Sequence, residues 1–213
     1  MEIKDRIKQK ADELYRRYGI RSVTMDEIAS QLGVSKKTIY HSFSDKNELV
    51  DEVIMDMLSF NRQCCQDYRS RSQNAIHEVF LAMDMLHVIF DNMNPSILHD
   101  IQRNHPLTFE KFKEFKYGYL FQIVKENIER GIKEELYREE INPEVVAIAR
   151  LETMMLPFNE SLFPRRKFPM VMLHQQLIEY FLFGIANPKG YKLIIKYQKE
   201  RFDSNRKNKN AVQ

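Results

Sequence analysis

The side chains with the clearest chemical potential lie just after residue 35, where cationic and hydroxyl groups alternate with apolar residues. If this segment is helical, Ile39 and Phe43 lie on one face and the polar groups on the other. A short helix with such an exposed face can enter the DNA major groove and contact phosphates and base edges. We therefore predict that this surface binds double-stranded DNA. Its polar side chains are those of Lys36, Lys37, Thr38, Tyr40 and His41.

The preceding residues supply the elements that would hold this segment in place. Thr24 and Glu27 form a capping box, which starts a helix by satisfying its free N–H groups. Gly33 can adopt the left-handed backbone that ends a helix, and Ser35 can cap the next helix. Ala29 is small enough to let the two helices cross closely. This combination predicts a helix-turn-helix, and a tight hairpin in any all-α domain is the alternative.

Composition favours a helical, non-catalytic protein. Hydrophobic residues make up 43% of the chain, glycines number six and prolines seven, and the formal net charge is only +3. A case for nucleic-acid binding therefore depends on where the cations lie. No Gly-x-Ser-x-Gly, glycine-rich phosphate loop or His-Glu-x-x-His occurs, and the six histidines are scattered. We expect no enzyme activity, no cofactor and no metal site.

Cysteine usage and the amino terminus indicate the compartment. Cys64 and Cys65 are adjacent, so they do not suit an ordinary disulfide framework or a structural zinc site. Incidental or buried thiols are the simpler interpretation, and a vicinal redox or soft-metal switch is the alternative. No signal peptide is evident, and no apolar run approaches the ~18 residues that span a bilayer. A cytoplasmic protein without membrane contact is expected.

Helical periodicity and breakers divide the whole chain. The predicted fold is all-α, with a three-helix DNA-binding head over residues 1–46 and an antiparallel helical ligand-binding and dimerisation body over 47–190. Residues 191–213 are expected to form an amphipathic-to-basic tail whose cationic end is solvated and mobile. About nine helices are expected in total. Beyond the helix-turn-helix, the helices should cover about 3–18, 45–60, 75–90, 96–105, 107–132, 143–155 and 171–185.

A longer pattern starts at Gly33 and reads Gly-Val-Ser-Lys-x-Thr-Ile-Tyr-His-x-Phe-x-x-Lys-x-x-Leu, ending at Leu49. Gly19, Thr24 and Ile28-Ala29 stand at matching places before it. With these residues, the amino-terminal part of the chain resembles the TetR/AcrR family of bacterial transcriptional regulators. The resemblance covers roughly a quarter of the sequence. It implies a homodimer with a DNA-binding head and a helical body, in a family where many members are repressors released by a small molecule.

The resemblance also assigns roles at matching positions. Lys36 and Lys37 are candidates for base reading, because lysine can donate to guanine O6 and N7, although it serves phosphate equally well. For Tyr40 the alternative is that its ring packs within the head. Phosphate contacts are expected from Thr24, Thr38, Tyr40, His41 and Lys46.

Methionine and aromatic side chains in the body are candidates for a ligand cavity, since methionine adapts to irregular apolar shapes. Two polar residues within apolar helices could orient the ligand. The alternative is that all of these residues belong to an ordinary helical core with satisfied hydrogen bonds. The candidate ligand-binding residues are Met83, His87, Phe90, Phe121, Glu152, Met155 and Phe158.

The predicted function is a transcriptional regulator, a repressor that binds a pseudo-palindromic DNA operator as a homodimer. A small apolar or amphipathic effector would release it by shifting the helix that starts at Asp45. The dimer surface is expected on residues 143–155 and 171–185. A helical ligand carrier or enzyme with an incidental helix-turn-helix is one alternative. A ligand-blind architectural DNA-binding protein is the other.

Overall fold

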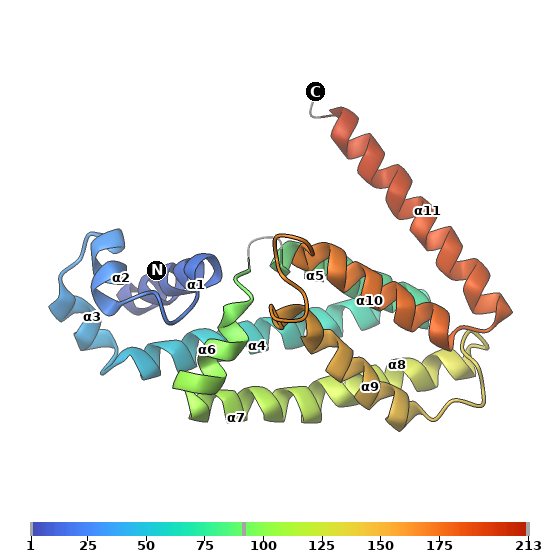
Figure 1. The fold of residues 1–213 in the computed structure, drawn as a ribbon, viewed down its shortest axis with the longest axis horizontal. Coiled ribbons are helices and arrows are strands. Elements are labelled where there is room, and N and C mark those ends of the chain that lie inside the picture. The colour runs from blue at the N-terminus through green and yellow to red at the C-terminus, as the bar shows by residue number, and fades with distance from the viewer. Residues whose placement is uncertain (1, 91–92, 212–213) are drawn as a thin grey trace.

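Helices make up the structure, as Figure 1 shows for this computed structural model. The structure describes residues 2–90 and 93–211, apart from the side chains of His87 and of residues 204–211. Within that part no β-strand forms, and an isolated bridge joins Tyr137 to Ala186. No helix in those ranges is long and apolar enough to cross a membrane. The predicted all-α fold class is confirmed.

Three short helices form the head at one end of the molecule (Figure 1). They are α1 (Ile3–Tyr18), α2 (Met25–Leu32) and α3 (Lys36–Ser42). Each contributes apolar residues at helical spacing to one core, and Ile28 and Ile39 are fully buried there. This burial fixes the angle at which α3 leaves the turn, and so it fixes which face of α3 remains in solvent.

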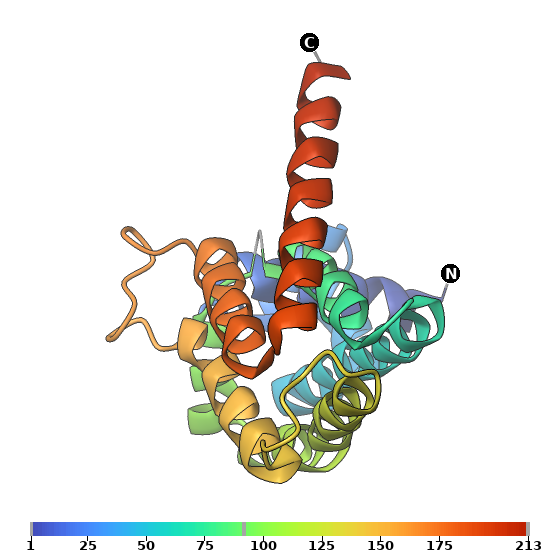
Figure 2. The ribbon, with the colours of Figure 1, turned by 90° about the vertical axis from the view of Figure 1, so that its right-hand side faces the viewer.

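The body consists of eight helices in the described part of the chain, and the connecting helix α4 runs from the head into the body (Figure 1). The helix α11 stands out from the rest in the turned view of Figure 2. The body helices are α4 (Lys46–Arg71), α5 (Ala75–Phe90), α6 (Ser96–Asn104), α7 (Pro106–Glu114), α8 (Phe121–Lys133), α9 (Pro143–Met155), α10 (Met170–Ile185) and α11 (Pro188–Ala211).

A π-helical turn over Phe115–Leu120 joins α7 and α8 into one continuous helix, as the long amphipathic segment predicted. Such turns insert an extra residue into a helix and are frequent at functional sites. Here Phe115 and Leu120 both face an internal cavity. The turn also buries Lys116, whose ammonium donates to the Glu152 carboxylate at 2.9 Å.

The helix α11 lies where the sequence predicted a tail. Pro188 occupies its first turn, and Ile194 and Tyr197 are buried against the body. The Tyr197 hydroxyl accepts a hydrogen bond from Asn74 at 2.9 Å, which ties α11 to the start of α5. The amphipathic start of the tail is therefore part of a docked helix. The side chains of its basic end lie outside the described residues.

The apolar core of the head continues into the body. One cluster joins head residues such as Phe43 to Phe90, Ile97 and Phe115, and a second cluster holds α5, α10 and α11 together. The division into a head and a body at residue 46 stays a prediction. The continuity of the first cluster means that displacement of a body helix is felt directly by the head.

Candidate nucleic-acid interface and ligand cavity

Both helices of the helix-turn-helix begin at capping residues. The Thr24 hydroxyl accepts a hydrogen bond from the Glu27 N–H at 3.1 Å, and the Ser35 hydroxyl accepts one from the Thr38 N–H at 3.1 Å. Caps of this kind each stabilise a helix by ~1 kcal/mol. They matter most for α3, because a helix of seven residues has little stability of its own.

The turn between the two helices has the geometry that its glycine allows. Gly33 lies in the left-handed region at φ 67° and ψ 32°, where other residues are strained. Its N–H donates to the Ser30 carbonyl, and the Val34 N–H donates to the Ala29 carbonyl at 3.0 Å. These bonds satisfy the last carbonyls of α2 and direct the chain into α3.

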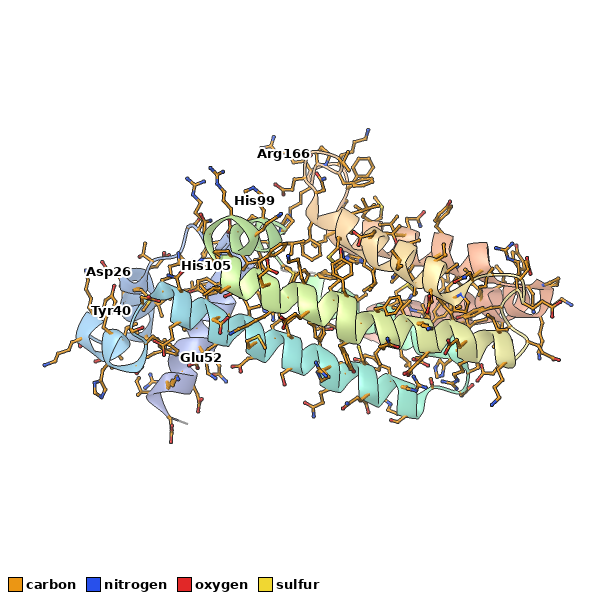
Figure 3. All side chains as sticks on the ribbon, turned by 90° about the horizontal axis from the view of Figure 1, so that it is seen from below. Asp26, Tyr40, Glu52, His99, His105 and Arg166 are labelled. Atoms are coloured by element: carbon orange, nitrogen blue, oxygen red, sulfur yellow. The ribbon has the colours of Figure 1, made fainter. Side chains whose placement is uncertain are left out.

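The α3 side chains that we predict to contact DNA are mostly in solvent. Lys37, Tyr40 and His41 are exposed, and Figure 3 shows Tyr40 and Asp26 at the outer end of the head. Lys36 is exposed too and pairs with Asp26 of α2. An exposed pair of this kind contributes ~0–1 kcal/mol, so phosphate or a base edge can displace the aspartate. Among the described residues, Lys37 has no ion-pair partner.

Two of the predicted contacts are less accessible. Thr38 is half-buried, and its hydroxyl lies 2.9 Å from that of Ser35. Lys46 is half-buried with its ammonium donating to the Ile20 carbonyl at 2.6 Å. Burial lowers the pKa of Lys46, and the nearby Asp100 carboxylate opposes that shift. Lys46 therefore ties α4 to the loop after α1, which the sequence did not predict.

That loop is also fastened to α6. The Asp100 carboxylate accepts hydrogen bonds from the Arg21 N–H at 3.0 Å and from the Ser96 hydroxyl at 3.2 Å. Gly19 adopts φ 80° in the same loop, and a Cβ there would lie 2.5 Å from the Ser96 oxygen. The close approach requires glycine, so the head and α6 form a fitted contact.

A cavity of about 200 Å³ lies inside the body, walled by α4 to α10 and the π turn. Three of the predicted ligand residues, Phe90, Met155 and Phe158, line this cavity. The other predicted ligand residues do not line the cavity.

Met83 is buried in the second core cluster, and Phe121 is outside the cavity wall. Glu152 is exposed and pairs with Lys116. The side chain of His87 lies outside the described residues.

Polar side chains in the cavity wall were missed from the sequence. Glu78 accepts from the Arg130 guanidinium at 2.9 Å, and the Asn127 amide donates to the Ala75 carbonyl at 2.9 Å. His174 stacks on Phe90 with ring centres 4.2 Å apart. Arg150 also faces the cavity, and the sequence contains a pattern from which its inward position could have been predicted. It follows the inward Ala147 by three residues on α9, at a spacing that belongs to the core face.

Cys64 and Cys65 are both half-buried on α4, and Cys65 lines the same cavity. Burial raises the pKa of Cys65 to about 11. A thiol with that pKa is protonated at neutral pH and is a poor nucleophile or metal ligand. The geometry therefore favours a packing role over a redox switch at this position.

Comparison with known proteins agrees with the geometry of the head. Residues 7–53 match the model of the family described as bacterial regulatory proteins, tetR family. The chain is 26% identical over 128 residues to the uncharacterised HTH-type transcriptional regulator YvaF of Bacillus subtilis, covering 58% of this chain and 65% of that one. It is 33% identical over 115 residues to an HTH-type transcriptional regulator of Staphylococcus aureus, covering 51% and 59%. The aligned part thus spans less than two thirds of these relatives.

Solved structures resemble the fold over nearly the whole chain. A TetR-family transcriptional regulator from Agrobacterium tumefaciens has a TM-score of 0.72 at 16% identity, covering 86% of this chain and 97% of that one. A transcriptional regulator from Cytophaga hutchinsonii has a TM-score of 0.66 at 20% identity, covering 85% and 97%. The head is a helix-turn-helix, and the overall fold is similar to that of these solved transcriptional regulators. Residues 7–53 match the tetR family, so the predicted resemblance of the amino-terminal segment is confirmed.

Proposed function

We propose that the protein is a transcriptional repressor of the TetR type that binds a pseudo-palindromic operator as a homodimer. The observation that carries this function is the exposed face of α3. Its cations, phenol and imidazole lie in solvent because Ile39 and Phe43 are buried beneath them. That face fits a major groove, and a regulator of this kind acts in the cytoplasm, where bacterial DNA lies.

Within this proposal, the side chains divide into readers and anchors. Lys36 and Lys37 contact base edges, and Lys36 does so after it leaves Asp26. Thr24, Thr38, Tyr40 and His41 contact phosphates on either side of the groove. Lys46 combines two tasks, because its ammonium holds the Ile20 carbonyl and keeps two further hydrogens for phosphate. Phosphate contacts position the head, and base contacts select the sequence.

A homodimer follows from the size of the reading surface. One short helix is too small to specify an operator, whereas a two-fold pair places two of them ~34 Å or somewhat further apart along the DNA. Apolar side chains that suit a dimer interface are exposed on α9 and α10. Val145 and Ile148 are 63% and 50% exposed, and Tyr180 is 79% exposed. An apolar surface of this kind normally meets a partner.

The test is selection of binding sites from random DNA. Wild-type protein should enrich an inverted repeat, and Lys37→Ala should change the preferred base at one position of each half-site by ~1–3 kcal/mol. Lys133→Ala, which removes an exposed cation at the end of α8, serves as the control and should leave the preferences unchanged. Enrichment of unrelated sequences by wild-type protein would contradict the proposal. Identical preferences for Lys37→Ala would reduce Lys37 to a phosphate contact.

Ligand control is part of the proposal, with a small apolar or amphipathic effector in the body cavity. Met57 and Leu58 of α4 and Ile97 and Ile101 of α6 line this cavity, so an occupant touches both helices that hold the head. A 100-fold loss of operator affinity requires ~2.7 kcal/mol of preference for the displaced arrangement. Apolar contacts along a cavity of this size supply that amount.

A further inference from the structure

Arg150 is the residue in the cavity wall whose charge is least balanced. Only 7% of its surface is exposed, and among the described residues its Nη1 has no hydrogen-bond partner. Its guanidinium carbon lies 5.2 Å from the centre of the Phe181 ring, a cation–π contact. Burying a cation without an anion is costly, so a chain that retains one needs a compensating reason.

The acid in the cavity wall is not available to Arg150. Glu78 is bound to Arg130 at 2.9 Å, and Arg130 is bound in turn to Glu134 at 2.7 Å. Burial lowers the pKa of Arg150 to about 10, with no opposing contribution from a carboxylate. The guanidinium therefore stays charged at neutral pH and faces a cavity whose other walls are mostly apolar.

We propose that the effector is an amphiphile with a carboxylate head group, held by Arg150, and an apolar chain in the remaining cavity. This inference rests on the proposed ligand-binding role of the cavity and names its chemical class. A carboxylate can accept two parallel hydrogen bonds from a guanidinium and balance its charge. Leu86, Ile89, Met93 and Phe158 offer apolar surface for the chain.

The charge pattern disfavours the other amphiphiles. A cationic ligand would bring a second positive charge beside Arg150, while the one carboxylate that lines the described cavity is already paired with Arg130. A neutral alcohol would leave the guanidinium charge unbalanced. The apolar walls are equally suitable for all three, so the head group alone decides among them.

The experiment compares decanoate, decan-1-ol and decylamine as probes of the wild-type protein by equilibrium dialysis at neutral pH. Decanoate should bind at least tenfold more tightly than either of the others. Arg150→Met should remove this preference while retaining decanol binding, and Arg150→Lys should keep part of the preference. Lys133→Met is the matched control, because it removes an exposed cation from the same body, and it should bind all three probes as wild type does.

Equal binding of decanoate and decanol would overturn the inference, as would an unchanged preference in Arg150→Met. Failure of every carboxylate from hexanoate to tetradecanoate to bind would overturn it too. The comparisons that use wild-type protein test the preference for a carboxylate even if a variant does not fold. Operator binding is measured separately with and without decanoate. Carboxylate binding without any effect on operator affinity would refute ligand control of DNA binding, but it would support the inferred chemical class of the ligand.

Discussion

Replacing Arg150 with methionine is expected to stabilise the protein without ligand, although the substitution removes a charged side chain from its interior. In most folded proteins, deletion of a buried charge leaves its partner unpaired and costs stability. Arg150 has no anionic partner among the described residues, so the change removes a penalty. Methionine is similar in length and flexible enough to fill the vacated space.

The magnitude follows from the pKa. Burial lowers the pKa of Arg150 to about 10, against an ordinary value of ~12.5. A difference of one in pKa corresponds to ~1.4 kcal/mol, so the charged form is disfavoured in the folded protein by about 3 kcal/mol. Loss of the contact with Phe181 offsets this by ~1 kcal/mol. The net gain is about 2 kcal/mol, and for a chain of this size the Tm should rise by ~4–8 °C.

The lowered pKa of Arg150 also determines how the stability difference between Arg150→Met and wild type depends on pH. Because the pKa is lower in the folded protein than in the unfolded chain, folding favours loss of the Arg150 proton. The penalty is therefore fully present at every pH below about 10 and fades only as the pH rises from there to the unfolded value. Between pH 6 and 9 the difference in stability between Arg150→Met and wild type should stay constant.

The assay is urea and thermal unfolding of protein refolded from denaturant, which removes amphiphiles acquired during expression. Lys133→Met should change the free energy of unfolding by less than ~0.5 kcal/mol, as exposed substitutions usually do. A loss of ~3–5 kcal/mol in Arg150→Met would refute the reasoning, since that is the cost of breaking a buried ion pair. Adding decanoate should stabilise wild type and leave Arg150→Met nearly unchanged.

Three other substitutions test the head and the cavity. Asp26→Asn should raise operator affinity by ~1 kcal/mol in electrophoretic mobility shifts, because it frees Lys36 and removes an anion beside phosphate; weaker binding would show that Asp26 orients Lys36. Gly19→Ala should lower the free energy of unfolding by ~1–3 kcal/mol, because it strains φ 80° and meets Ser96; an unchanged urea midpoint would show that the loop is loose. In a Cys64→Ser background, Cys65 should alkylate slowly at pH 7 and faster as the pH approaches about 11, and rapid reaction at pH 7 would contradict its burial.

Local signals were sufficient to predict the helix-turn-helix. Thr24, Gly33 and Ser35 act through hydrogen bonds and dihedral angles within a few residues, so their roles can be inferred from spacing alone. The predicted start of a helix at residue 143 also depends on local groups, because Pro143 lies in the first turn of α9 and the Asn142 side chain accepts from the N–H groups of residues 144 and 145.

Apart from Arg150, whose place on α9 could be inferred from local spacing, the wrong predictions depend on contacts between distant segments. Met83 and Phe90 are both large apolar residues of α5. Met83 belongs to the core cluster that contains α10 and α11, whereas Phe90 lines the cavity. Periodicity places both on an inner surface but does not say which inner surface. Glu152 was expected inside and lies outside, because Lys116, 36 positions earlier, draws its carboxylate away. The docking of α11 likewise depends on Asn74, which is remote in sequence.

The helix α6 connects the two proposed sites. Ile97 and Ile101 line the cavity, and Asp100, on the same turn of the helix, holds the Arg21 N–H of the head. An occupant that tilts this turn must lengthen the bond between Asp100 and Arg21. A hydrogen bond to a charged group contributes ~1.5–3 kcal/mol, which is close to the ~2.7 kcal/mol that a 100-fold change in operator affinity requires. Asp100→Asn should therefore weaken the response to ligand, measured as the ratio of operator affinities with and without decanoate. A ratio equal to that of wild type would place the coupling in α4 alone.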